Sequence, residues 1–198
     1  PFMLGYNDAI QDYEYNPAKA KQLLAEAGYP NGFEVQLHVM PVSRPYMFDP
    51  PKIGEAIQSY LGAVGIDVSI YQVDWGTYLQ ETESGMHNMR LLGWTGDNGD
   101  PDNFMNVLYG SNAANIGAAG NYSFILNPEL QEALTAAVRT YDVDERARLY
   151  KKAQVMIHED AGWVYIAHAN QNLAFRKNVK GYSLHPTSRK FFYPVTLE

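Results

Sequence analysis

The segment of residues 93–104 carries the densest set of chemically useful side chains in this sequence. It reads Gly-Trp-Thr-Gly-Asp-Asn-Gly-Asp-Pro-Asp-Asn-Phe and follows an apolar, strand-like run. Glycine and proline keep this backbone out of regular structure, so Asp97, Asp100 and Asp102 are presented on an irregular loop near the indole of Trp94. A carboxylate beside an aromatic ring on such a loop suits a cationic group, such as an ammonium.

A second candidate is Arg44, which lies in the segment Pro-Val-Ser-Arg-Pro-Tyr at residues 41–46. The flanking prolines constrain the backbone, and a guanidinium can grip a carboxylate through two parallel hydrogen bonds. An arginine in a solvated loop, paired with a surface acid, would also explain this residue. Arg44 is predicted to follow the first strand and Asp97 the third, and ligands gather at the carboxyl ends of parallel strands. One cationic and one anionic group on the same rim would suit a zwitterion.

The spacing of the three aspartates does not fit a calcium loop. An EF-hand requires glycine at its sixth position, which is Asp102 when counted from Asp97 and Met105 when counted from Asp100. His158-Glu159 resembles the start of a zinc-protease helix, but Gly162 stands where the second histidine is needed. The chain has no cysteine. We therefore expect neither a metal site nor a cofactor.

No catalytic motif supports an enzyme. The sequence contains no Gly-x-Ser-x-Gly elbow, no Ser-x-x-Lys motif and no Gly-x-Gly-x-x-Gly fingerprint. A hydrolase that uses Asp97 or Asp100 as a base is a less favoured alternative, because no nucleophile pairs with either residue. We expect a binding module with no catalytic residues.

Composition limits the remaining classes of function. The 198 residues suffice for one large domain, or for a domain and part of another. The net charge is −7 and the basic residues are scattered, which argues against a nucleic-acid partner. No apolar run approaches the roughly 20 residues of a membrane helix. The chain opens at Pro1 without a signal peptide, so we expect an internal or C-terminal piece of a longer protein.

The elements that position the two loops alternate between strand and helix. Strands are predicted at 33–40, 66–73 and 88–94, and helices at 17–27, 50–64 and 75–83. This order predicts an α/β fold with crossover helices. Further helices are predicted at 102–109, 129–140 and 142–159, and further strands at 162–168, 172–175, 179–182 and 191–197. The last ~30 residues lack helices, and we expect them to belong to a different sheet.

The segments around Arg44 and Asp97 together resemble those of bacterial periplasmic dipeptide-binding proteins, the solute-binding class of peptide ABC importers. The resemblance extends over nearly the whole chain. It includes Tyr6-Asn7-Asp8 with Gln11-Asp12-Tyr13, Tyr15-Asn16-Pro17-x-Lys19-Ala20, Asp74-Trp75-Gly76-x-Tyr78 and Val179-Lys180-Gly181-Tyr182.

This resemblance implies the C-terminal lobe of a two-lobed Venus-flytrap protein, with a mixed sheet flanked by helices and the N-terminal lobe absent. Residues 1–170 would form the ligand-binding lobe, and residues 171–198 would cross back toward the other lobe. The implied location is the periplasm, and the implied partners are a dipeptide, the N-terminal lobe and an inner-membrane ABC permease.

The resemblance also assigns the site. Asp97 would take the peptide ammonium and Arg44 the terminal carboxylate. The other ligand-binding residues would be Tyr46, Trp75, Trp94, Thr95 and Gly96. Relatives that bind longer peptides, haem or another solute form the main alternative.

Overall fold

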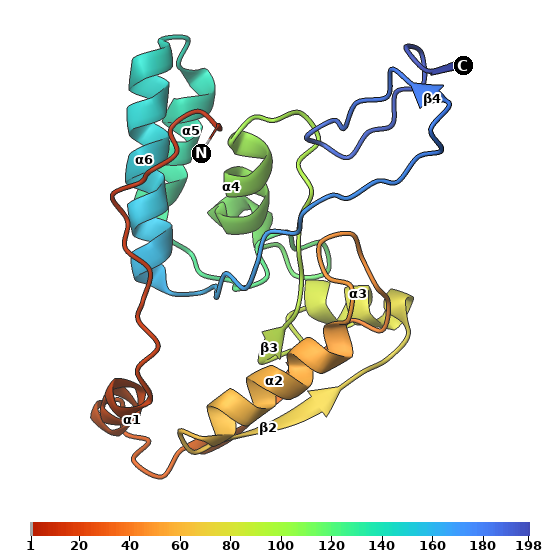
Figure 1. Ribbon diagram of the computed structural model, residues 1–198. Helices are drawn as coiled ribbons and strands as arrows, with labels where there is room; N and C mark the ends of the chain where they lie inside the picture. The colour runs from red at the N-terminus through yellow and green to blue at the C-terminus, as the bar shows by residue number, and fades with distance from the viewer. Residues whose placement is uncertain (1) are drawn as a thin grey trace.

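A parallel sheet of three strands organises the first half of the chain. The computed structural model describes residues 2–198 and places β1 (Phe33–His38), β2 (Ile66–Tyr71) and β3 (Met89–Arg90) in the order β2-β1-β3 (Figure 1). β1 pairs with β2 along its whole length, whereas only Leu37 and His38 pair with β3. The predicted succession of strands and crossover helices is confirmed.

Helices α1 (Pro17–Glu26), α2 (Pro50–Gly62) and α3 (Trp75–Glu83) alternate with these strands. Apolar side chains from the sheet, α3 and the adjoining loops form one core, which consists of Leu37, Val39, Met40, Met47, Val68, Tyr78 and Leu91. α2 packs against it through half-buried residues such as Ile53 and Ile57. The loops after β1 and β3 therefore start from a buried, rigid base.

A group of helices forms the second half of the molecule. It comprises α4 (Asp102–Tyr109), the short 3-10 helix η1 (Ser111–Ala113), α5 (Pro128–Arg139) and α6 (Val143–Asp160). α5 and α6 lie side by side as a hairpin, with α4 next to them (Figure 1). Their shared core contains Leu130, Leu134, Ala137, Leu149, Tyr150, Ala153 and Ile157. The N-terminal segment runs along α6, where the Gln154 side chain donates to the Gly5 carbonyl at 2.6 Å.

Asparagine and aspartate side chains begin most of these helices. The five cap residues that accept a backbone N–H of the first turn are Asn16, Asp49, Asp74, Asn127 and Asp142. Three of them precede a proline at the first helical position, where a missing N–H costs nothing. These local signals explain why the predicted helices are confirmed to within a few residues. No helix in residues 2–198 has the length and apolar character needed to cross a membrane.

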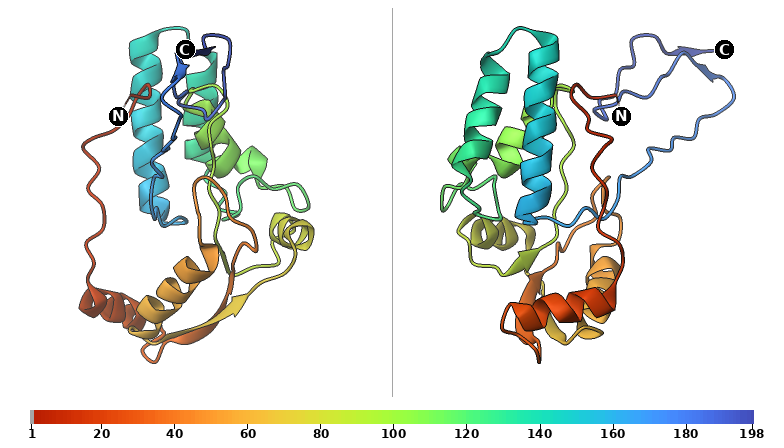
Figure 2. Two further views of the ribbon diagram at one scale, coloured as in Figure 1. Left: turned by 45° about the vertical axis from the view of Figure 1, so that its right-hand side comes forward. Right: turned by 90° about the vertical axis from the view of Figure 1, so that its left-hand side faces the viewer.

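The C-terminal segment differs from the expectation. The predicted strands at 162–168 and 172–175 are wrong. A strand needs a neighbouring backbone to take its hydrogen bonds, and within residues 2–198 no other strand pairs with these two segments. Only β4 (Val179–Lys180) and β5 (Thr196–Leu197) pair, as a separate antiparallel ladder. This segment extends away from the helices (Figures 1 and 2). The expectation of a second sheet near the C-terminus is confirmed.

Candidate ligand-binding site

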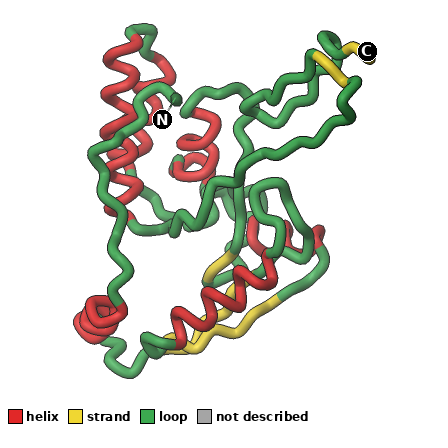
Figure 3. The backbone as a smooth tube through the Cα atoms, in the orientation of Figure 1, coloured by secondary structure: helices red, strands yellow, loops and turns green. Residues whose placement is uncertain are grey.

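The loops that carry Arg44 and Asp97 leave the same edge of the sheet. β1 and β3 are adjacent and parallel, with His38 opposite Arg90, so the chain leaves both strands at the same end. Both strands pass directly into loops, and Figure 3 shows this for β3. The prediction that these two loops share a rim is confirmed.

Arg44 is held against an aromatic surface. Its backbone forms a two-way hydrogen-bonded bridge with Met47, each N–H donating at 2.9 Å. Its guanidinium carbon lies 4.4 Å from the ring centroid of Trp75, and Trp75 stacks on the buried ring of Tyr78 with centroids 5.3 Å apart. The ion pairs among residues 2–198 do not include Arg44. The alternative of an arginine paired with a surface acid is therefore wrong, and its donors are free for a ligand.

Tyr46 links the two loops. A methyl group at Gly93 would lie 2.2 Å from Cδ2 of Tyr46, so the ring packs directly on the start of the Asp97 loop. Burial raises the pKa of Tyr46, and the positive charges of Arg44 and Arg90 oppose this shift. The Tyr46 hydroxyl is thus a neutral hydrogen-bonding group at neutral pH.

The Asp97 loop is organised by Asn103, in the first turn of α4. The Asn103 Oδ1 accepts from the Asp97 backbone N–H at 2.9 Å and from Trp94 Nε1 at 3.1 Å. The Asn103 Nδ2 donates to Asp97 Oδ2 at 3.2 Å. One amide side chain therefore fixes the backbone and the carboxylate of Asp97 together with the Trp94 indole.

The remaining loop residues differ in how firmly they are held. A methyl group at Gly96 would lie 2.6 Å from Cε2 of Phe104, so only glycine fits there without a shift. Trp94 is 40% exposed, which leaves part of its ring available for contact. Thr95 is exposed and makes no side-chain hydrogen bond within residues 2–198. Thr95 is therefore the least constrained residue of the predicted set.

The carboxylates of the loop have different surroundings. Asp100 forms an ion pair with Arg146 at 2.8 Å, and Asp102 accepts from the Asn106 side chain. Asp97 is exposed and forms no ion pair, and its Oδ1 has no hydrogen-bond partner within residues 2–198. Of these three, Asp97 is the carboxylate best able to take an external cation, and Asp100 is poorly placed to act as a base.

The site is open in this chain. A groove of about 830 Å³ lies over α5, between Leu126, Gln131 and Arg139, and none of the seven predicted residues lines it. The predicted residues are instead half-buried or exposed.

Sequence reasoning missed two supporting residues. Asn103 is a single asparagine after an acidic loop, and its bonds to Trp94 and Asp97 depend on how the loop folds back onto α4. The sequence marks Tyr78 only as part of a motif, whereas in the structure its ring supports Trp75 and its hydroxyl donates to the Leu91 carbonyl. Burial raises the pKa of Tyr78 to about 12. Its place on the inner face of α3, three residues after Trp75, was the available signal.

An α/β lobe that presents an unpaired arginine and an unpaired aspartate from neighbouring loops has the features of a ligand-binding protein. The model of the bacterial extracellular solute-binding proteins, family 5, matches residues 1–116. The chain belongs to this family.

Individual relatives match the whole chain. The sequence is 42% identical over 198 residues to the dipeptide-binding protein of Escherichia coli (strain K12), and 40% identical to heme-binding protein A of Haemophilus influenzae (strain ATCC 51907 / DSM 11121 / KW20 / Rd). All of this chain is covered in both cases, but only 37% and 36% of those relatives. The chain thus spans little more than a third of their length.

Solved structures of related proteins contain the same fold as this chain. The dipeptide-binding protein from Pseudoalteromonas sp. SM9913, in complex with Met-Leu, superposes with a TM-score of 0.87 at 33% identity. The match covers 100% of this chain and 39% of that structure. The α/β class is confirmed, and the sheet of three strands is entirely parallel, with the antiparallel pair separate from it.

Proposed function

We propose that this chain is the C-terminal lobe of a periplasmic solute-binding protein that captures dipeptides for an ABC importer. Asp97 binds the peptide ammonium and Arg44 binds its carboxylate. The observation that carries this proposal is the pair of opposite charges, each without an ion-pair partner in residues 2–198, on loops that leave adjacent parallel strands. The relatives named for dipeptide binding support it.

Two fixed end groups would select peptides by length. An extended dipeptide spans roughly 6–7 Å from its nitrogen to its carboxyl carbon, and each end adds a hydrogen bond of about 2.9 Å. The Asp97 carboxylate and the Arg44 guanidinium should therefore lie about 13 Å apart in the complex when both bonds run along the peptide, and down to about 9 Å when the bonds are angled to it. Each further residue would add about 3.5 Å. The anchors would read the ends of the peptide, while the side chains of the ligand meet the aromatic rings of Tyr46, Trp75 and Trp94.

The energetics favour recognition of the ends. A charge-assisted hydrogen bond contributes about 1.5–3 kcal/mol, whereas a charge left unpaired in a closed cleft costs several kcal/mol. Blocking one end of the peptide should therefore weaken binding more than changing a side chain. Peptide amides would pair with protein backbone as an added strand does, which tolerates varied side chains.

A second lobe would complete the site. The C-terminal segment exposes large apolar side chains that have no core to enter in residues 2–198, namely Val164, Leu173, Phe175, Leu184, Phe192 and Leu197. Exposed apolar surface of this extent marks an interface. We assign its partner to the N-terminal lobe of the same protein, with residues 1–170 as the ligand-binding lobe and residues 171–198 crossing back. The inner-membrane permease would then receive the closed, loaded form.

The test uses the full-length protein and isothermal titration calorimetry. A dipeptide, its N-acetyl form and its C-terminal amide are titrated separately, and mass spectrometry follows the peptide for turnover. Tight binding of the free dipeptide, weak binding of both blocked forms and no cleavage support the proposal. Equal binding of all three forms would contradict it, and cleavage would favour the hydrolase alternative.

A second candidate ligand is haem or a longer peptide, since one relative at 40% identity is named as a heme-binding protein. Titration with haem, followed by its Soret absorption, and with a tetrapeptide separates these ligands from a dipeptide. The unpaired state of both end charges favours a peptide over haem, because haem carries no ammonium for Asp97, and the spacing of the two anchors is what would separate a dipeptide from a longer peptide.

A further inference from the structure

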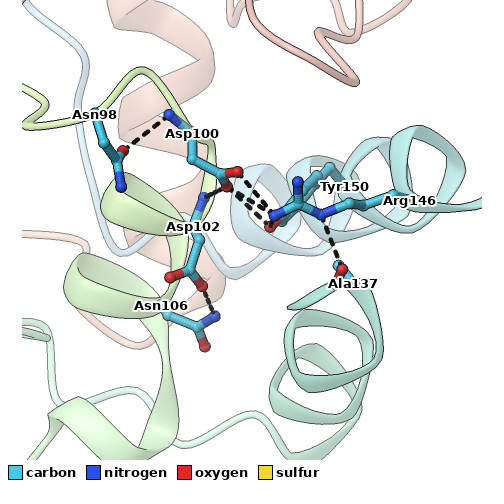
Figure 4. Close-up of polar contacts among 7 residues, drawn as sticks. All are labelled: Asn98, Asp100, Asp102, Asn106, Ala137, Arg146 and Tyr150. Atoms are coloured by element: carbon cyan, nitrogen blue, oxygen red, sulfur yellow. Dashed lines mark hydrogen bonds and ion pairs between the residues drawn. The ribbon is translucent and has the colours of Figure 1, made fainter. Parts of the chain in front are cut away.

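Arg146 of α6 joins the Asp97 loop to the helical hairpin. Its Nη2 donates to both carboxylate oxygens of Asp100, at 3.0 and 2.8 Å, and its Nε donates to the Ala137 carbonyl of α5 at 3.0 Å (Figure 4). The same Nη2 lies 3.2 Å from the Tyr150 hydroxyl. One guanidinium thus contacts α5, α6 and the loop before α4.

The Arg146–Asp100 ion pair is less exposed to water than a neighbouring ion pair on the same helix. The side chains of Arg146 and Asp100 are 23% and 30% exposed, and they rest on Tyr150, which is fully buried. Arg148, two residues further along α6, pairs with Glu145 at the surface, where the two side chains are 63% and 44% exposed. Exposed pairs contribute little to stability, so Arg148 provides a matched control.

Hydrogen bonds inside the loop connect Asp100 to Asp97. The Asp100 carboxylate accepts from the Asp102 backbone N–H at 2.9 Å, and the Asp100 backbone N–H donates to the Asn98 side chain at 2.9 Å (Figure 4). Asn103 joins the two aspartates, because its backbone N–H donates to the Asp100 carbonyl at 3.2 Å and its side chain binds Asp97. The loop is therefore one hydrogen-bonded unit, and the Arg146–Asp100 pair attaches this unit to α5 and α6.

We propose that Arg146 is a positioning residue for the ammonium anchor. By holding Asp100, it fixes the loop so that Asp97 points at the ligand, although Arg146 itself does not touch the ligand. This inference rests on the proposed role of Asp97 and adds that the α5–α6 hairpin sets the orientation of that anchor. A site held by supporting contacts of this kind loses precision when they are removed.

The test compares Arg146→Met with Arg148→Met in the full-length protein. Calorimetry measures the affinity for a free dipeptide and for its N-acetyl form, and the ratio of the two reports how well the ammonium is recognised. Arg146→Met should lower this ratio about tenfold, within the coupling range of residues in one hydrogen-bond network. Arg148→Met should leave the ratio unchanged. Arg146→Lys, which keeps a cation near Asp100, should restore part of it.

A double-mutant cycle separates positioning from general destabilisation. In an Asp97→Asn background, Arg146→Met should cause no further loss of the ratio, because its effect passes through Asp97. Asp100→Asn, which keeps the shape of the side chain, should reproduce the effect of Arg146→Met. It replaces Arg146→Met in this test if that variant does not fold.

Two results would overturn the inference. In the first, the wild type prefers the free dipeptide to its N-acetyl form, and Arg146→Met and Asp100→Asn keep the same preference. The other is an equal loss for both peptides, which indicates a merely structural role. A wild type that binds both peptides equally would instead refute the ammonium anchor, and this inference with it.

Discussion

Asn103 holds Asp97 at two points, its backbone N–H at 2.9 Å and its carboxylate Oδ2 at 3.2 Å. An amide suits this role, because its side chain accepts with one atom and donates with the other. The Asp97 Oδ1 is left without a hydrogen-bond partner in residues 2–198. Asn103 therefore sets the direction of the carboxylate and leaves one of its oxygens open to the ammonium.

Replacing Asn103 tests this relationship. Asn103→Ala removes the acceptor for Asp97 and Trp94, and we expect a loss of dipeptide affinity of about five- to tenfold, from a net contribution of about 1 kcal/mol for a typical hydrogen bond. Calorimetry on the full-length protein measures it. Asn115→Ala is the control, since Asn115 is exposed and, within residues 2–198, its side chain bonds only to the Asn112 carbonyl. An unchanged affinity in Asn103→Ala would mean that the loop is fixed by other contacts.

Removing either end anchor should lower dipeptide affinity more than removing Asn103 does. Arg44→Ala or Asp97→Asn should lower dipeptide affinity at least about tenfold, because a charged end of the peptide then lacks its partner. The blocked peptides provide the matched control. Asp97→Asn should no longer distinguish a free from an acetylated N-terminus, and Arg44→Ala should no longer distinguish a free from an amidated C-terminus. If either variant keeps the preference that it is meant to lose, that residue is not the anchor.

The features of the fold that depend on local signals could be predicted from the sequence. Asn16, Asp49 and Asn127 each stand directly before a proline, and each begins a helix in the structure. The shared rim of Arg44 and Asp97 was also predictable, because it follows from the order of strands and helices. In both cases the signal is contained within a short stretch of chain or in the succession of elements.

The remaining features depend on contacts between distant parts of the chain. The apolar runs at 162–168 and 172–175 look like strands, but pairing requires a neighbour that the sequence pattern cannot supply. The Arg146–Asp100 pair joins residues 46 positions apart, and nothing in the composition around Arg146 indicates it. The sequence likewise does not show which carboxylate has an ion-pair partner, since Asp97 and Asp100 are chemically identical until their contacts are known.

Close packing between Gly93 and Tyr46 leads to a third prediction. Gly93→Ala should lower both stability and dipeptide affinity, because the new methyl group would meet the Tyr46 ring at 2.2 Å. Overpacking of this kind typically costs about 1–3 kcal/mol. Thermal unfolding and calorimetry measure the two effects. Gly62→Ala is the control, since nothing lies within 4 Å of a methyl group there. A Gly93→Ala protein with wild-type stability and affinity would show that the ring moves aside freely.

Two neighbouring histidines, His38 buried and His87 half-buried, predict how stability depends on pH. His38 is 1% exposed, and its Nε2 lies 3.4 Å from Glu81 Oε2. The ring centroid of His38 lies 6.1 Å from that of His87, whose Nε2 lies 3.0 Å from the Tyr122 carbonyl. Burial lowers the pKa of both histidines, and the positive charge of Arg90 adds to this shift, whereas Glu81 opposes it at His38.

Because the folded pKa values lie below the unfolded value of about 6.5, the folded chain binds fewer protons than the unfolded chain in this range. The contribution of these histidines to the free energy of unfolding should therefore be complete above pH ~6.5. It should decrease as the pH drops from there toward the folded pKa values. Urea unfolding of the full-length protein between pH 7.5 and pH 5 measures this slope. His38→Gln and His87→Gln should each flatten this slope. A slope that persists in the double variant would place the responsible groups elsewhere.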